Sequence, residues 1–138
     1  MLRKFALVLF ASGVTLLAQM PPGAWWNSPA FKEMNVSPAQ MRQIRTTVRE
    51  YRPKLQELRA AVETADQNLL AEFNKDPIDN QKASAAIDQL ISARSELTRT
   101  LSQMGLKLRA VLTLQQWQDL VKRFPPRNQR KLAGPTGL

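Results

Sequence analysis

The chain has 138 residues and a formal net charge of +9, and it contains neither cysteine nor histidine. It therefore lacks the commonest ligands of zinc, copper and haem, the usual imidazole base and any means of forming a disulfide. It also has no Gly-rich phosphate loop, so we expect no enzymatic activity and no cofactor.

The first residues predict an export signal. Arg3 and Lys4 precede an uncharged, mostly apolar run from Phe5 to Ala18, and this order is typical of a secretory signal peptide. The run is shorter than the roughly 20 residues that a membrane-spanning helix needs, so a retained anchor is the less favoured alternative. We expect residues 1–18 to be removed and the protein to reside in a bacterial periplasm.

Without the predicted signal the chain has 18 basic and 11 acidic residues, a net charge of +7. Such an excess favours a polyanionic partner. Nucleic acid is scarce outside the cytoplasm, so no nucleic-acid partner is expected. Anionic lipid headgroups and negatively charged unfolded proteins fit the predicted location better.

The segment after the signal begins with a predicted linker, residues 19–27, and a short helix is expected from Ser28 to Met34. The adjacent Trp25 and Trp26 are expected to pack on the helical body that follows.

Two long helices are predicted next, over residues 38–73 and 77–112. In both, apolar residues recur in alternating steps of three and four, the pattern of a coiled-coil seam. In the first helix they are Met41, Ile44, Val48, Tyr51, Leu55, Leu58, Val62, Ala65 and Leu69. In the second they are Ala83, Ile87, Leu90, Leu97, Leu101, Met104, Leu108 and Val111, interrupted by Arg94.

A short connection joins these helices. Asp76 is a candidate N-cap for the second helix and Pro77 suits its first position, with Asp79 reinforcing the start. A connection this short forces the helices to run antiparallel. A further helix is expected over residues 114–124, followed by a disordered basic tail, residues 125–138. The predicted fold is all-α, with residues 28–124 forming an antiparallel hairpin and short flanking helices.

Pro53 lies inside the first long helix, where it removes one hydrogen bond and clashes with the preceding turn. Because the seam continues through it without a change of phase, we predict one bent helix and a hairpin with a curved face. Ile91 and Leu106 lie off the second seam, so one copy leaves apolar surface uncovered. A second copy is expected to cover it, giving a dimeric cradle.

Two stretches share a pattern that starts helices. Ser37 and Thr113 are good N-caps, and Gln40 and Gln116 stand three residues later as capping-box partners. Apolar residues on both sides, Val36 with Met41 and Leu112 with Trp117, form hydrophobic staples.

The second stretch, Leu112-Thr113-Leu114-Gln115-Gln116, resembles the LTxxQ motif of the Spy/CpxP family of periplasmic proteins. The first departs from it at Val36 and Ser37. The resemblance spans most of the chain after the signal and implies an envelope-stress protein that binds unfolded or aggregation-prone clients without ATP, usually as a homodimer. Relatives that resemble ZraP and the sensor domain of CnrX bind zinc, nickel or cobalt instead.

The residues present argue against the metal-binding branch, because no histidine is available as a ligand. The methionines after the signal are Met20, Met34, Met41 and Met104. They are scattered, which favours core packing over copper(I) binding. A hard cation on Glu63 and Asp66, or on Asp76 and Asp79, is the other alternative. No metal site is predicted.

The candidate client-binding residues are four arginines of the first long helix, Arg45, Arg49, Arg52 and Arg59. Their spacing places them in a stripe beside the apolar seam, where they attract acidic clients whose apolar segments then meet apolar surface. The alternative is a solvated flank, with some arginines paired to Glu50 or Glu63.

The preferred hypothesis is an ATP-independent periplasmic chaperone for unfolded client proteins. The alternative is a periplasmic heavy-metal sensor or resistance protein, or an adaptor that restrains a signalling partner, with transient contact to the membrane surface or a membrane-bound sensor. A structural coiled-coil protein without clients is the third hypothesis.

Overall fold

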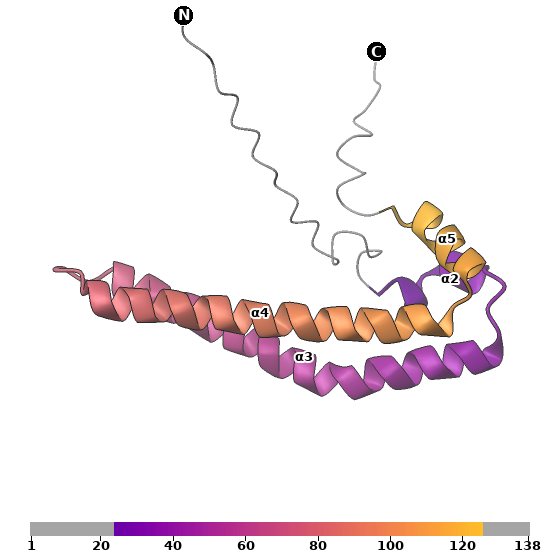
Figure 1. The fold of residues 1–138 in the computed structure, drawn as a ribbon, viewed down its shortest axis with the longest axis horizontal. Coiled ribbons are helices and arrows are strands. Elements are labelled where there is room, and N and C mark those ends of the chain that lie inside the picture. The colour runs from indigo at the N-terminus through magenta and orange to yellow at the C-terminus, as the bar shows by residue number, and fades with distance from the viewer. Residues whose placement is uncertain (1–23, 126–138) are drawn as a thin grey trace, which may run out of the picture.

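A computed structural model describes residues 24–125; the predicted signal peptide, and all but the first residue of the predicted tail, lie outside the described residues. Within this range every secondary-structure element is a helix and no strand is present, so the predicted all-α fold class is confirmed. Figure 1 shows two long helices side by side, with the short elements gathered at one end. We call this end the base, and the opposite end, at residues 74–79, the tip. None of the described helices is long and apolar enough to cross a membrane.

The first long helix, α3, spans Pro38–Phe73, the same residues that the apolar seam predicts. Its 36 residues extend over about 54 Å at the usual rise per residue. Pro53 lies inside this helix without ending it. Figure 1 shows α3 bending along its course, so the prediction of one bent helix is confirmed.

The second long helix, α4, spans Asn80–Val111 and starts later than predicted. Asp79, with an extended backbone, is its N-cap and accepts a hydrogen bond of 3.0 Å from the backbone N–H of Lys82. The prediction that Asp76 caps this helix and Pro77 opens it is therefore wrong. A helix can begin where a side-chain oxygen accepts a hydrogen bond from the backbone N–H of the residue three positions later. Asp79 makes this hydrogen bond with Lys82.

The contact between α3 and α4 follows the predicted seam on α3 but not everywhere on α4. Near the tip, Ala86 is buried at 6% exposure, whereas the predicted seam residue Ile87 is 39% exposed. Ala65 and Ala83 are also buried there. Small side chains thus form this part of the contact, and the larger isoleucine remains outside it.

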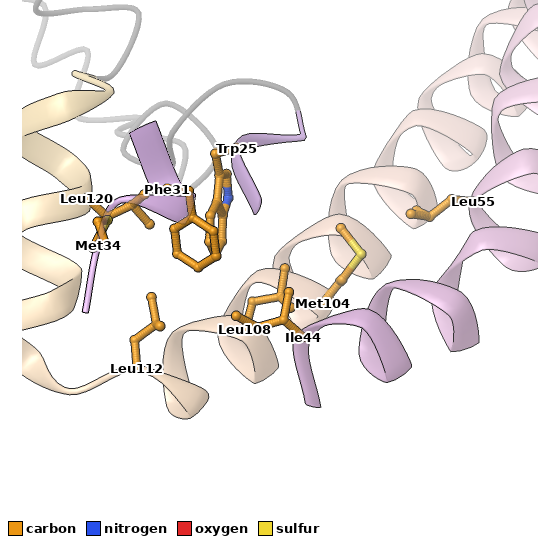
Figure 2. Close-up of a cluster of buried hydrophobic side chains, with 9 residues drawn as sticks. All are labelled: Trp25, Phe31, Met34, Ile44, Leu55, Met104, Leu108, Leu112 and Leu120. Atoms are coloured by element: carbon orange, nitrogen blue, oxygen red, sulfur yellow. The ribbon is translucent and has the colours of Figure 1, made fainter. Parts of the chain in front are cut away.

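The main hydrophobic core lies at the base, where the short elements close on the long helices. They are the 3-10 helix η1 (Trp25–Asn27) and the α-helices α2 (Pro29–Lys32) and α5 (Leu114–Arg123). The buried cluster, drawn in Figure 2, comprises Trp25, Phe31, Met34, Ile44, Leu55, Met104, Leu108, Leu112 and Leu120.

Trp25 is 2% exposed, and its ring centroid lies 5.1 Å from that of Phe31 in an edge-to-face contact. Trp26 is partly buried against the same core. The expected packing of both tryptophans is confirmed. Residues 25–27, which the sequence predicts as part of a linker, form η1 instead.

Candidate partner-binding surface

The two LTxxQ-like stretches both form capping boxes. Ser37 Oγ accepts a hydrogen bond from the N–H of Gln40, and Gln40 Oε1 accepts one from the N–H of Ser37. Thr113 and Gln116 repeat the arrangement at the start of α5, with distances of 3.1 and 2.9 Å. The predicted capping chemistry is confirmed at both sites.

The residues that flank these caps belong to the base core. Leu112 is buried, and Val36, Met41 and Trp117 are partly buried against the same cluster. The predicted staple residues are therefore part of the packing that holds α3, α4 and α5 together.

The two capping glutamines also bind each other. Gln40 Nε2 donates to Gln116 Oε1 at 2.9 Å and to the carbonyl of Val111 at 2.9 Å. Gln116 Nε2 donates to the carbonyl of Asn35 at 2.7 Å and lies 3.2 Å from Gln40 Oε1. We call this network the glutamine junction. Sequence reasoning missed it, although one motif repeated at both ends of an antiparallel hairpin was the available signal.

The four predicted arginines lie on an open surface of α3. We call Arg45, Arg49, Arg52 and Arg59 the arginine row; all four are exposed. None has an ion pair or side-chain hydrogen bond to another described residue, so the alternative of pairing with Glu50 or Glu63 is not seen. Four guanidinium groups at helical spacing are thus available to an anionic partner.

A second exposed surface surrounds the tip. We call it the tip patch; its large apolar residues are Leu70, Phe73, Ile78, Ile87 and Ile91, between 39% and 61% exposed. Leu106 is 68% exposed on α4. The expectation that a single copy leaves apolar surface uncovered, including Ile91 and Leu106, is confirmed.

Formal charge changes sign along the hairpin. Residues 60–93, which include the tip, contain six acidic and two basic residues, a net charge of −4. The other described residues, 24–59 and 94–125, contain thirteen basic and five acidic residues, a net charge of +8. The base and the arginine row are therefore positive, and the tip is negative.

Two of the carboxylates near the tip, Asp66 and Asp79, have clear partners within the protein. Asp66 forms an ion pair of 3.4 Å with Arg94 across the two long helices. The pKa of the Asp79 carboxyl is lowered, mainly because it accepts the hydrogen bond of the Lys82 N–H at the start of α4.

The described residues do not fit a metal site. They contain no group of three or more histidine, cysteine, aspartate or glutamate side chains placed to hold an ion. Met34 and Met104 are 8% exposed and belong to the base core, so their thioethers serve packing.

An open groove of about 350 Å³ lies between α3 and α4 near the base. It is lined by Gln43, Thr46, Thr47, Lys107, Ala110 and Val111. The Lys107 ammonium is 5.1 Å from the ring centroid of Tyr51, which fixes it in a cation–π contact. The lining contains no carboxylate and no recognisable base beside a nucleophile.

These features define an all-helical hairpin protein. Its two capping motifs hydrogen-bond to each other at the base, and its arginine row and tip patch are exposed. The chain belongs to the heavy-metal resistance family, whose model matches residues 5–119. This family is part of the superfamily of Spy/CpxP/ZraP-like periplasmic proteins, so the resemblance at the LTxxQ motif is confirmed at that level. No curated protein and no solved structure gives a significant match.

Proposed function

We propose that this chain is an exported, periplasmic component of a heavy-metal resistance response and that it acts by binding another protein, as an adaptor or sensor-like subunit. The family match over residues 5–119 carries this proposal, because it covers the whole hairpin and most of α5. Export is supported by the signal-like segment at residues 1–18.

The arginine row is the proposed partner-binding surface. Its guanidinium groups lie on one face of α3 and have no partner within the described part of the chain. Such a row attracts an acidic protein surface over about a Debye length, roughly 8 Å at physiological salt, and then binds carboxylates with good geometry. We propose an acidic domain of a membrane-bound signalling protein as the partner.

In this proposal the response to metal does not depend on a metal site in this chain. The sequence has no histidine or cysteine, and the described carboxylates and buried methionines do not form a ligand set. Calorimetric titration with zinc, nickel and copper should therefore show no binding tighter than micromolar.

A deletion strain of the source bacterium tests the proposal. Growth in zinc, nickel or copper should be impaired, and the wild-type gene should restore it. A gene with Arg45, Arg49, Arg52 and Arg59 all replaced by alanine should fail to restore growth. A control with Lys54→Ala and Lys122→Ala, which removes two exposed cations elsewhere, should restore it. Unchanged tolerance to all three metals in the deletion strain would refute the proposal.

A chaperone for unfolded clients is the second candidate, and the tip patch favours it. Leu70 and Ile91 are 61% and 58% exposed, and exposed apolar residues are what unfolded segments bind. The protein should then suppress light scattering by a denatured client at near-stoichiometric ratios, more weakly at high salt and after loss of the arginine row. Absence of suppression would exclude this candidate and leave the adaptor role intact.

A further inference from the structure

We infer that the base of this protein docks on an anionic lipid surface through the outer side of α5. Leu114, Trp117 and Val121 are spaced by three and four residues, which places them along one side of this helix. We call them the α5 face. Leu114 is 61% exposed, and Trp117 and Val121 are only partly buried. Of the residues of α5, Leu120 alone is buried, so the helix has a second apolar side that the core does not cover.

A cation lies beside the aromatic residue of this face. The guanidinium group of Arg109 is 5.6 Å from the ring centroid of Trp117, and its Nη1 donates a hydrogen bond of 3.0 Å to the carbonyl of Leu112. A guanidinium has several further N–H donors, which match the oxygens of a phosphate. Tryptophan is enriched where a membrane meets water, and arginine reaches that layer from an apolar stem. The pair therefore suits a headgroup region.

The charge of this part of the chain fits an anionic surface. Residues 112–138 contain five basic residues and one acidic residue, a net charge of +4. Three of the basic residues, Arg127, Arg130 and Lys131, come after the described residues. A cluster of basic residues on or beside an amphipathic helix attracts acidic headgroups. Two copies that met through α5 would instead bring like charges together, so a lipid surface fits better than a second copy.

The connection to the predicted export signal also points to the base. Five residues, 19–23, separate the end of the apolar run at Ala18 from the first described residue, Ala24. They extend over at most about 18 Å. The base is thus the end of the hairpin that lies near the membrane during export, and the tip is at the opposite end (Figure 1).

Docking through α5 leaves the arginine row open. The row extends along α3 away from the base, and Arg59 is 21 residues from the first residue of α3, about 32 Å at the usual rise per residue. A protein partner beside the membrane can therefore still reach the row. The inference goes beyond the proposed function and does not depend on it, because lipid binding requires neither metal nor a signalling partner.

Sedimentation with lipid vesicles tests the apolar part of the inference. The protein is purified in its exported form, and its binding is compared between vesicles of phosphatidylcholine alone and vesicles with equal parts of phosphatidylcholine and phosphatidylglycerol. One variant carries Leu114→Ser. Its matched control carries Ile91→Ser, which removes an apolar side chain of similar exposure, 58%, near the tip. Circular dichroism establishes that each variant is helical before its binding is measured.

The wild type should bind the anionic vesicles at least about tenfold more tightly than the neutral ones, and binding should weaken at about 1 M salt, where the Debye length is about 3 Å. Leu114→Ser should reduce the affinity at least about threefold, because the leucine no longer enters the interface. Ile91→Ser should leave the affinity unchanged, since the tip does not contact lipid.

Two matched charge variants test the electrostatic part. The tail variant carries Arg127→Glu, Arg130→Glu and Lys131→Glu. The row control, with Arg45→Glu, Arg49→Glu and Arg52→Glu, changes the net charge by the same amount on α3. The tail variant should bind anionic vesicles at least about tenfold more weakly than the wild type, because each cation near an anionic surface strengthens binding severalfold. The row control should lose less.

Lipids with bromine atoms on their acyl chains show whether α5 itself enters the interface. These atoms quench the fluorescence of a tryptophan that reaches the acyl chains. The wild type should be quenched on binding, and Trp117→Phe should remove most of this quenching. Adhesion by charge alone, without docking of α5, would leave Trp117 unquenched.

Four results would overturn the inference: equal binding to neutral and anionic vesicles, equal losses for Leu114→Ser and Ile91→Ser, quenching that survives Trp117→Phe, or a row control that loses more binding than the tail variant. The last result would place the lipid contact on α3. The vesicle assay contains no metal and no protein partner, so its outcome is separate from the growth test of the proposed function.

Discussion

The side chains of Gln40 and Gln116, 76 residues apart in sequence, hydrogen-bond to each other at the base of the hairpin. Each also caps the start of its own helix. Gln40 binds the carbonyl of Val111, so the end of α4 joins the same network. The starts of α3 and α5 and the end of α4 are therefore held by one pair of carboxamides.

Replacing Gln116 by alanine should lower the free energy of unfolding by about 2–3 kcal/mol, because it removes a cap and two donated hydrogen bonds. Urea denaturation followed by circular dichroism measures this change. Gln115→Ala is the matched control, since Gln115 is exposed and its side chain forms no hydrogen bond within the described part of the chain. Equal effects of the two substitutions would show that the glutamine junction contributes nothing.

The two glutamines should also be energetically coupled. The double variant Gln40→Ala with Gln116→Ala should lose about 1 kcal/mol less than the sum of the single losses, because the first substitution already removes the shared hydrogen bond. A double-mutant cycle on the free energy of unfolding gives the coupling directly. Strict additivity would mean that the contact between the carboxamides is not maintained in solution.

Leu106 and Leu108 provide a matched pair on α4. Leu108 is fully buried and Leu106 is 68% exposed. Leu108→Ala should cost about 2–5 kcal/mol of stability through lost burial and a cavity, whereas Leu106→Ala should change it by less than about 0.5 kcal/mol. Thermal and urea denaturation of both variants checks the prediction, and a large loss for Leu106→Ala would indicate that another surface covers it.

The contact through Ala86 should tolerate little added volume. Ala86→Leu is expected to destabilise the hairpin by about 1–3 kcal/mol, because Ala86 is buried and the added methyl groups overpack its surroundings. Ala85→Leu adds the same atoms at an exposed position and should be nearly neutral. The reverse ranking in urea denaturation would place Ile87, not Ala86, in the seam.

The cap of α4 should depend on pH. The pKa of Asp79 in the folded protein lies below its ordinary value of 3.8, so the ionised carboxylate stabilises the folded state above that value. This contribution should be lost as the pH falls through the lowered pKa. NMR titration of the Asp79 carboxyl should give a midpoint below 3.8. Asn also caps helices well, so Asp79→Asn should retain the helix start and abolish this pH dependence.

Much of the fold follows from local rules that the sequence displays. The bounds of α3 agree with the apolar seam and with the Ser37 cap, because Pro38 and Gln40 complete a standard helix start. The capping boxes were predictable for the same reason. The exposure of the arginine row followed from its position beside the seam of an antiparallel pair.

The errors arose where several local choices have similar free energies. Asp76 and Asp79 are both acceptable caps, and the tertiary arrangement selects the second. Ala86 and Ile87 are adjacent, and the folded hairpin buries the smaller side chain and leaves the larger one exposed. The Gln40–Gln116 contact joins residues 76 positions apart. The repeated capping motif indicates it only together with a hairpin that brings both motifs to the base.

The burial of Trp25 at the base determines what tryptophan fluorescence can measure in this protein. Trp26 and Trp117 pack against the same core as Trp25, and these are the three tryptophans of the chain. Tryptophan fluorescence will therefore report melting or repacking at the base, and it will not change when the helices fray at the tip. Spectroscopy of the other end requires a reporter introduced there, such as a tryptophan in place of Phe73.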